Sequence, residues 1–248
     1  MVLPLFHLAH SANAPIPEPG LVVELTGVEA KHAATVRRMR VGEGIQLANG
    51  VGLRVVGVVE LVEPARLMVR VQVSEVEILP EPRLCLVQAL AKGDRDELAI
   101  QAATELGASA VIPWQADRSV SRWEGPKISK GVDRWQAIVS EAAKQALRSN
   151  TPVVTQPVTT KQLAKLVSEN KTVLVLDPTA DNKLSQVSLP TEGEVLICVG
   201  PEGGITEAEL ILLEAAGAVR VRLGTEILRT STAGLAAISV LQSKLARW

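Results

Sequence analysis

Aromatic side chains are scarce in this chain of 248 residues, which has four tryptophans, one phenylalanine and no tyrosine. Proteins that stack single-stranded RNA on their surface use aromatic rings to do so, and we therefore expect no stacking platform of that kind. An excess of charge of one sign is missing as well, because 26 lysines and arginines are balanced by 27 acids. An anionic partner therefore has to be bound by a local basic patch.

Long apolar runs and cysteines are also few. No apolar run approaches the roughly 18 residues that span a bilayer, and the first residues lack the positive charge of a secretion signal. We expect Cys85 and Cys198, both in apolar strand-like runs, to be buried free thiols in a reducing cytoplasm. The histidines join no cluster of cysteines or carboxylates, so we expect no metal site.

The common nucleotide and hydrolase motifs are absent. The sequence contains no G-x-G-x-x-G after a strand, no G-x-x-x-x-G-K-[ST], no G-x-S-x-G and no H-E-x-x-H. These absences disfavour dinucleotide oxidoreductases, P-loop enzymes, α/β-hydrolases and zinc proteases. A generic nucleotide-binding α/β enzyme, which the composition alone would allow, is for the same reason the least favoured interpretation.

The pattern of apolar residues predicts two domains, 1–79 and 80–248. The first is mainly β: residues 21–25 and 66–78 read as strands, and Asn49-Gly50 is typical of a type I′ hairpin turn. A helix is predicted to begin after Thr26, whose hydroxyl would cap it, and to continue to about residue 40.

The chain changes character after the LPEPR stretch at 79–83. Beyond it, short apolar β-branched runs alternate with helical segments to the end of the chain. This alternation predicts a mostly parallel sheet that is covered by helices on both faces.

The stretch EVLICVGPEGGITEAEL (194–210) is the strongest candidate for a ligand site. A buried strand runs into three glycines at 200–204, and Thr206 with Glu209 forms a capping-box pattern for the next helix. Glycines let the backbone approach a ligand, and open α/β sheets bind ligands at the carboxyl ends of their strands. A tight turn without a ligand is the alternative, and we favour ligand contact.

A second candidate is VRVRLGTEILRTSTAGLAAISVLQ (219–242). A strand is followed by an irregular segment, and Arg229 stands just before a long helix with a face of small residues (Ala233, Gly234, Ala236, Ala237). Such a loop can offer backbone groups to a polar ligand while Arg229 faces an anion. The alternative is a capped core helix with a solvated arginine.

Two basic stretches are candidates for contact with phosphate. Lys92 and Arg95 crowd a strand-to-helix turn in which Asp94 could cap the helix. The stretch from Lys31 to Arg40 contains four lysines or arginines (Lys31, Arg37, Arg38 and Arg40) and no acid. Capping by Asp94 explains the acids of the first stretch but not Lys92 and Arg95, whereas the second stretch could also be an ordinary solvated helix face.

Four segments together resemble one family. KGDRDELAIQAATELGASAVIPWQADRSV, RWQAIVSEAAKQALR, ICVGPEGGITEAEL and LGTEILRTSTAGLAA follow in the order seen in the ribosomal RNA small subunit methyltransferase E family of the SPOUT class. RRMRVGEGIQLANG is similar to the N-terminal domain of that family. The resemblance implies a mixed α/β fold, with a PUA-like RNA-binding β-barrel domain followed by a SPOUT α/β domain that ends in a trefoil knot.

The resemblance also implies an activity and a set of site residues. The activity is methylation of N3 of a uridine in 16S ribosomal RNA, with S-adenosyl-L-methionine as cofactor and the small ribosomal subunit and a second copy of the chain as partners. Arg229 is our first candidate for the catalytic residue, because a guanidinium between the cofactor loop and the helix start would stabilise the negative charge that develops on uracil. The implied cofactor-binding residues are Leu176, Asp177, Pro178, Val199, Gly200, Glu202, Gly203, Gly204, Leu223, Gly224, Ile227, Leu228, Arg229, Thr230, Thr232 and Ala233. The residues expected to bind RNA, some of them across the dimer, are Arg37, Arg38, Arg40, Lys92, Arg95, Arg118 and Arg148.

This sequence departs from the family pattern at three positions. Asn49 and Ser231 stand where the family usually has acids, and Glu226 stands where it has an arginine. Glu226 could replace the acid missing at Ser231. Two other interpretations stay open: a SPOUT methyltransferase that acts on another RNA position or on a ribose 2′-hydroxyl, and a catalytically silent RNA-binding protein.

Overall fold

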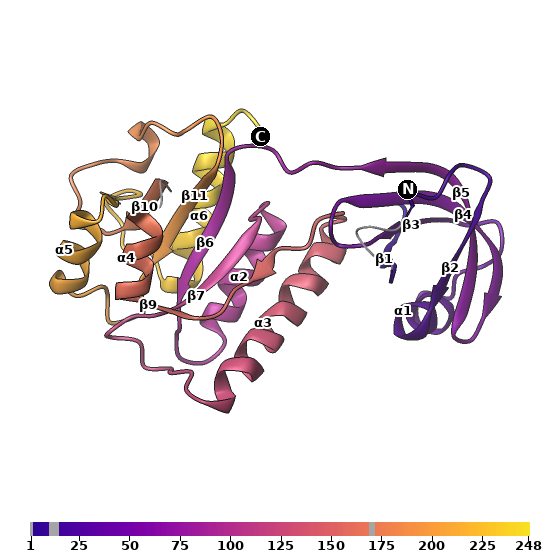
Figure 1. Ribbon diagram of the computed structural model, residues 1–248, viewed down its shortest axis with the longest axis horizontal. Coiled ribbons are helices and arrows are strands. Elements are labelled where there is room, and N and C mark those ends of the chain that lie inside the picture. The colour runs from indigo at the N-terminus through magenta and orange to yellow at the C-terminus, as the bar shows by residue number, and fades with distance from the viewer. Residues whose placement is uncertain (1, 10–14, 169–171) are drawn as a thin grey trace. The chain divides into compact units, whose positions relative to one another are not determined.

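The computed structural model describes residues 2–9, 15–168 and 172–248. It divides into two compact units, shown in Figure 1, the first drawn mainly in indigo and the second in the later colours. The first unit consists of Met1–Leu79 with Ala143–Thr151, and the second of Pro80–Ala142 with Pro152–Trp248. The first unit therefore takes in a short segment from the middle of the chain.

The first unit is built on a five-stranded sheet in the order β1-β3-β4-β5-β2. Its pairs are antiparallel except β1 with β3, which is parallel. The alternating apolar residues of β4 and β5 point into a core with Phe6, Ile45 and Leu47. The elements of this unit are β1 (Leu5–His7), β2 (Val22–Thr26), α1 (Gly27–Lys31), a short π-helix (His32–Val36), β3 (Gly44–Ala48), β4 (Leu53–Glu63) and β5 (Arg66–Val76).

The helix predicted from Thr26 to residue 40 is shorter than expected. Thr26 is the last residue of β2, pairs with Arg66 and forms no side-chain cap. The π-helix ends before Arg38, which takes a left-handed conformation with a φ of 53°. This change of winding buries Met39 while Arg38 and Arg40 stay exposed.

The predicted hairpin at Asn49-Gly50 is confirmed, but its connection is longer than a two-residue turn. Ala48 pairs with Arg54, and the Asn49 side chain accepts hydrogen bonds from the amides of Val51 and Leu53. The segment Ala143–Thr151 packs against this loop, since the Thr151 amide donates to the Gly50 carbonyl at 2.9 Å.

The second unit has a seven-stranded parallel sheet, which confirms the prediction. Six strands run in the order β12-β10-β11-β6-β7-β8, and β9 pairs with β7. The elements are β6 (Arg83–Ala89), α2 (Arg95–Glu105), β7 (Ala110–Gln115), α3 (Pro126–Gln145), β8 (Val153–Val154), β9 (Val158–Thr159), α4 (Thr160–Ser168), β10 (Thr172–Leu176), a 3-10 turn (Leu184–Gln186), β11 (Glu194–Val199), α5 (Glu207–Ala215), β12 (Val219–Val221) and α6 (Thr230–Lys244).

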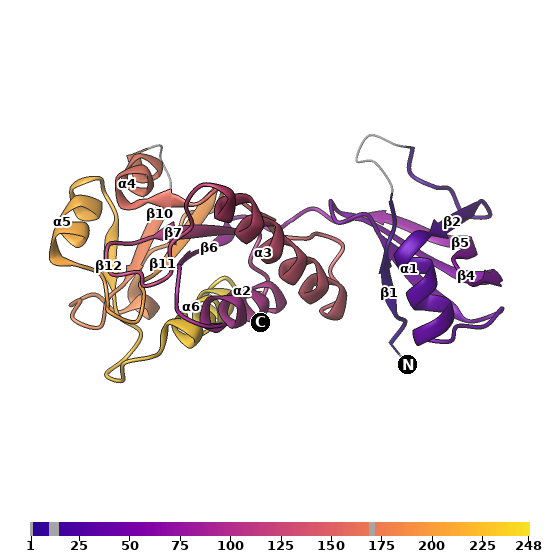
Figure 2. The same ribbon diagram turned by 90° about the horizontal axis from the view of Figure 1, so that it is seen from below.

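Helices cover both faces of this sheet, as Figure 2 shows. Leu86 of β6 and Ile197 of β11 lie in a core with Ile100 of α2, Trp135 of α3 and Ile238 of α6. On the opposite face a second core contains the sheet residues Val87 and Cys198 and the helical residues Leu163 of α4 and Leu213 of α5. Cys85 and Cys198 are buried free thiols, as predicted, and burial raises the pKa of Cys198.

The parallel sheet and the preceding β unit agree with the predicted mixed α/β fold. The trefoil knot stays a prediction of the resemblance. No helix in the described part of the chain is long and apolar enough to cross a membrane.

Candidate active site

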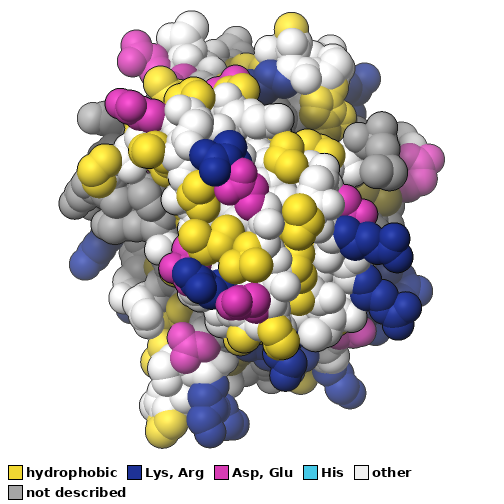
Figure 3. Space-filling view, turned by 90° about the vertical axis from the view of Figure 1, so that its right-hand side faces the viewer, with side chains coloured by type: hydrophobic (Ala, Val, Ile, Leu, Met, Phe, Trp, Pro, Cys, Tyr) yellow, Lys and Arg dark blue, Asp and Glu magenta, His cyan; other side chains and the backbone are white. Residues whose placement is uncertain are grey.

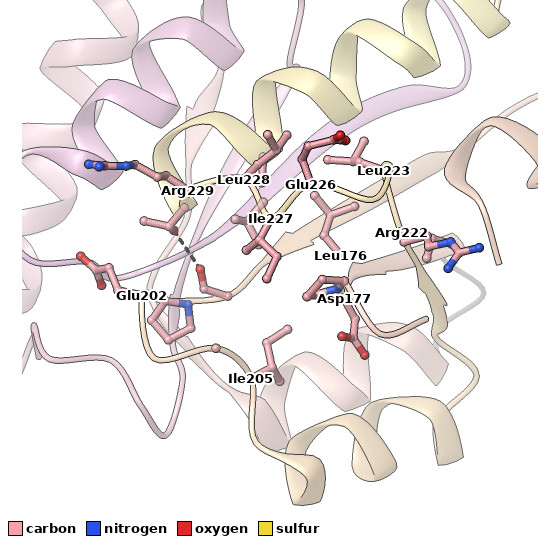
Figure 4. A pocket seen from close by; sticks show the side chains of 18 of the residues that line it. Leu176, Asp177, Glu202, Ile205, Arg222, Leu223, Glu226, Ile227, Leu228 and Arg229 are labelled. Atoms are coloured by element: carbon pink, nitrogen blue, oxygen red, sulfur yellow. Dashed lines mark hydrogen bonds between the residues drawn. The ribbon is translucent and has the colours of Figure 1, made fainter. Parts of the chain in front are cut away.

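A cavity of about 590 Å³ opens at the carboxyl ends of β10, β11 and β12. Three segments surround it: the residues after β10, the glycine-rich loop after β11, and the segment between β12 and α6 (Figure 4). Its lining residues are Arg95, Leu176, Asp177, Pro178, Val199, Gly200, Pro201, Glu202, Gly204, Ile205, Leu210, Val221, Arg222, Leu223, Gly224, Glu226, Ile227, Leu228, Arg229, Thr230 and Ala233. Three carboxylates and three arginines are thus brought to one largely apolar cavity.

The side chains in Figure 4 divide the cavity into three zones. Arg229 and Glu202 lie at one end, Asp177 and Arg222 at the other, and Leu176, Ile205 and Ile227 between them. An apolar middle with charged ends suits an elongated ligand that has an apolar ring system and charged substituents.

Glycines make the loop after β11 compact. A Cβ on Gly200 would lie 2.6 Å from Cγ1 of Ile205, and Gly204 has a φ of 73°. The loop ends in the predicted capping box, in which the Thr206 hydroxyl accepts from the amide of Glu209 and the Glu209 carboxylate accepts from the amide of Thr206. The backbone therefore turns sharply at the cavity edge and runs directly into α5.

Glu209 also holds this turn in place through further hydrogen bonds. Its side chain is only 3% exposed and accepts hydrogen bonds from the Thr160 hydroxyl at 2.7 Å and the Asp117 amide at 2.9 Å. Burial acts to raise the pKa of Glu209, but these hydrogen bonds and those from Thr206 outweigh it, and the pKa is lowered. A buried charged acceptor thus joins the starts of α4 and α5.

Two arginine side chains and one backbone amide hold the glycine-rich loop in place. Oε1 of Glu202 accepts from the Arg95 guanidinium at 2.8 Å and from the Lys92 amide at 3.1 Å. The Arg118 guanidinium donates to the carbonyl of Gly203 at 2.9 Å. Burial acts to raise the pKa of Glu202, but the hydrogen bonds outweigh it and the pKa is lowered. Glu202 is therefore a poor proton acceptor at neutral pH.

Asp177 is held at the opposite end of the cavity. Its carboxylate accepts from Nε of Arg220 at 2.8 Å and from the amide and hydroxyl of Thr179 at 2.9 Å each. Burial acts to raise the pKa of Asp177, but the hydrogen bonds from Thr179 and Arg220 outweigh it, and the pKa is lowered. This carboxylate stays ionised and keeps a fixed orientation.

The third segment is open to solvent. Residues 224–229 are exposed, with Ile227 80% exposed, whereas the next residue, Thr230, begins α6 and is buried. The Thr230 hydroxyl donates to the Gly200 carbonyl at 2.8 Å, which links this segment to the glycine-rich loop. Arg229 thus stands on the cavity rim, immediately before a firmly held helix start.

Most residues predicted to bind the cofactor line this cavity, and two do not. Gly203 faces Arg118, since a Cβ on Gly203 would lie 3.1 Å from Cβ of Arg118. Thr232 is exposed on the first turn of α6, where its hydroxyl donates to the Arg229 carbonyl. Glu226 lines the cavity, whereas Ser231 is outside its lining.

The residues predicted to bind RNA have different surroundings. Arg37, Arg38 and Arg40 are exposed on the first unit. Arg148 is half-buried in that unit, and burial lowers its pKa to about 10. Lys92, Arg95 and Arg118 belong to the second unit, where the Lys92 amide and the guanidinium groups of Arg95 and Arg118 bond the glycine-rich loop; of these three residues only Arg95 lines the cavity. Asp94 forms no side-chain cap, and Asp96 instead accepts from the Ala91 amide.

Three residues that organise the site were not foreseen. Arg220 pairs with Asp177, Thr160 bonds Glu209, and Gln88 donates to Thr230. Their partners lie 43 to 142 positions away along the chain, so local patterns give little indication of them. Gln88 alone stands out in the sequence, as a polar residue in an apolar strand. No group of three or more potential metal ligands occurs among the residues that the structure describes.

Comparison with known proteins identifies the family of this chain. The model of an RNA methyltransferase domain matches residues 79–242, and that of an RNA methyltransferase PUA domain matches residues 25–67. Ribosomal RNA small subunit methyltransferase E of Mycobacterium bovis is 41% identical over 238 residues, which cover 94% of this chain and 90% of that protein. The chain belongs to the ribosomal RNA small subunit methyltransferase E family.

Other members agree with this assignment. The Bacillus subtilis enzyme of the same name is 35% identical, with 90% of this chain and 91% of that protein covered. The crystal structure of ribosomal RNA small subunit methyltransferase E from Neisseria gonorrhoeae, bound to S-adenosyl methionine, is 29% identical and superposes with a TM-score of 0.86 over 98% of both chains. The fold and the activity class of this chain are those of an RNA methyltransferase.

Proposed function

We propose that this protein methylates N3 of a uridine in 16S ribosomal RNA of the small subunit, with S-adenosyl-L-methionine as methyl donor. The observation that supports it most directly is the cavity at the carboxyl ends of β10, β11 and β12, in a chain that aligns over nearly its whole length with this family. At about 590 Å³ the cavity lies within the usual range for small-molecule sites.

The residues present fit the donor. Leu176, Ile205 and Ile227 offer apolar contact to an adenine ring, and the carboxylates of Asp177 and Glu202 complement the cationic groups of the donor. A bound donor would supply an electrophilic methyl group: its transfer would break the sulfur–methyl bond, leave the sulfur as a neutral thioether, form the N3–methyl bond and pass the N3 proton to water. We propose the predicted cofactor-binding residues that line the cavity as its contacts.

Arg229 is the proposed catalytic residue. Loss of the N3 proton leaves negative charge on O2 and O4 of uracil, and a guanidinium beside these atoms stabilises that charge. Arg229 is exposed at the rim and so can reach an incoming base. The protein also aligns donor and acceptor, which can account for roughly 7–11 kcal/mol of the barrier. Because RNA constrains the target base, we expect the base to turn outward.

The first unit is proposed as the RNA-binding domain, with the boundary to the methyltransferase domain at residues 79 and 80. Arg37, Arg38 and Arg40 supply its phosphate contacts, in line with the match to an RNA methyltransferase PUA domain. Apolar, basic and acidic side chains are intermixed on the face drawn in Figure 3. We therefore expect RNA binding to depend on a few basic side chains and not on a uniformly basic face. We further propose a homodimer that acts in the cytoplasm, where ribosomal subunits are assembled.

One experiment tests the proposed function. Purified protein is incubated with methyl-labelled donor and small ribosomal subunits that lack the modification, and the RNA is then digested to nucleosides. The proposal predicts label in N3-methyluridine. Label in a 2′-O-methylated nucleoside or another base would identify a different SPOUT activity, and absence of label with retained subunit binding would identify a silent RNA-binding protein.

A further inference from the structure

A buried glutamine connects two of the segments that line the cavity. Gln88 lies near the end of β6 in the sequence RLCLVQA and is 0% exposed. Burying a side-chain amide is unfavourable unless its groups are hydrogen-bonded, so an apolar residue would be the usual occupant of this position. Gln88 therefore calls for an explanation beyond the packing of the strand.

The contacts of Gln88 fix the orientation of its side-chain amide. Its Nε2 lies 3.1 Å from the carbonyl oxygen of Ala89 and 2.9 Å from the hydroxyl oxygen of Thr230. A carbonyl can only accept, which fixes the nitrogen of the amide on this side. The amide consequently donates to Thr230, and the Thr230 hydroxyl donates its own proton to the Gly200 carbonyl at 2.8 Å.

Close packing brings the donors and acceptors within reach. Side chains of β6 alternate between the two faces of the sheet, and Leu86 and Gln88 point to the same face. A Cβ on Gly234 of α6 would lie 2.9 Å from Cδ1 of Leu86, so the helix approaches the strand closely. The small residues at the start of α6 thus allow the amide of Gln88 to reach the first residue of the helix.

We propose that Gln88 is a positioning residue for methyl transfer, an inference that rests on the proposed function. Gly200 begins the glycine-rich loop, Thr230 begins α6, and both line the cavity. The chain of hydrogen bonds from Gln88 through Thr230 to Gly200 fixes these two segments relative to each other. Because Arg229 directly precedes Thr230, the same hydrogen bonds fix the position of the Arg229 backbone at the cavity rim.

The variants Gln88→Met and Thr230→Val test this role, since each keeps similar volume and removes one member of the chain. We expect the turnover of each at saturating donor to fall about 10- to 100-fold, because a displacement of 1 Å in a catalytic site has effects of that order. The turnover of the double variant is expected to be no more than about twofold below that of the less active single variant, because both changes break the same chain of hydrogen bonds. Thr230→Ser, which keeps the hydroxyl, is expected to retain about tenfold more turnover than Thr230→Val.

Gln242→Met is the matched control. Gln242 is also buried, but its Nε2 donates to the Leu106 carbonyl, and it is not among the cavity lining. We expect this variant to keep turnover within about threefold of the original chain. The melting temperature of all variants is measured together with turnover, since a purely structural Gln88 would lower the melting temperature and leave the turnover of the folded protein unchanged.

The possible results separate this inference from the proposed function. If the original chain methylates uridine and Gln88→Met does so equally well, Gln88 has no positioning role. Losses that multiply in the double variant would also overturn the inference, because they would show independent effects. If the original chain transfers no methyl group to RNA, the proposed function fails instead.

Discussion

Replacement of Glu202 by glutamine distinguishes two roles of this carboxylate. Glu202 could accept the N3 proton, or it could hold the glycine-rich loop in place through Arg95 and the Lys92 amide, with its charge complementing the cationic donor. The side chains of the Arg95–Glu202 pair are 43% and 26% exposed, and ion pairs with such exposure contribute about 0.2–1 kcal/mol. Because a glutamine carbonyl can still accept both hydrogen bonds, the loss of the charge is the main change.

The expected effect of Glu202→Gln is therefore small. A loss of up to about 1 kcal/mol corresponds to roughly a fivefold change in turnover or donor affinity. Removal of a general base instead reduces turnover about 10²- to 10⁴-fold. The lowered pKa of Glu202 agrees with the holding role, because it weakens the carboxylate as a base.

Steady-state kinetics with small subunits and titration calorimetry with the donor measure both quantities. Glu105→Gln on α2 serves as a control, because Glu105 accepts from Gln101 and lies outside the cavity lining. A loss of turnover of 10²-fold or more in Glu202→Gln, with the donor affinity unchanged, would refute the holding role and point to proton acceptance.

Three further predictions concern other charged groups. Arg229→Ala should lower turnover about 10²- to 10³-fold and donor affinity by a much smaller factor, since the proposed role is to stabilise the charge that develops as N3 ionises. Kinetics and calorimetry measure both, and equal turnover with weaker donor binding would contradict the role. Reversing Arg37, Arg38 and Arg40 to glutamate should weaken RNA binding and flatten its salt dependence in filter-binding assays, without changing donor affinity. Asp177→Asn should lower the free energy of unfolding measured in urea at pH 7. Because the pKa of Asp177 is lowered in the folded protein, this loss relative to the original chain should persist above pH 3.8, the ordinary pKa value, and vanish as the pH falls further.

The sequence is sufficient to predict the architecture of the second unit. Apolar runs such as 194–199 alternate with helical segments, and both the parallel sheet and its two covered faces follow from that pattern. The capping box at Thr206 was equally predictable, because both of its partners lie within one helical turn. In each case the decisive interactions are local or repeat with a fixed period.

The parts that the sequence does not reveal depend on partners far apart in the chain. Lys144 forms an ion pair with Glu29 at 2.8 Å, 115 positions away, within the first unit, and no local pattern of either residue indicates it. The left-handed Arg38 was missed because the spacing of 26–40 agrees with one continuous helix.

The candidate site was foreseen only in part for the same reason. Glycines at 200–204 mark a place where the backbone can approach a ligand, but they do not show which of them face it. Gly203 turns toward Arg118 because that arginine is held across the loop by its bond to the Gly203 carbonyl. The roles of Gln88 and Arg220 follow only from the packing of strands and helices.

The central claim is that the cavity between the glycine-rich loop and residues 223–230 binds the methyl donor. The most direct test is a crystal structure of the protein grown with S-adenosyl-L-methionine or its demethylated product. We predict density for the nucleoside among Leu176, Ile205 and Ile227, with the sulfur near the Arg229 end of the cavity. Density for the ligand at another place, with this cavity filled by side chains, would contradict the account.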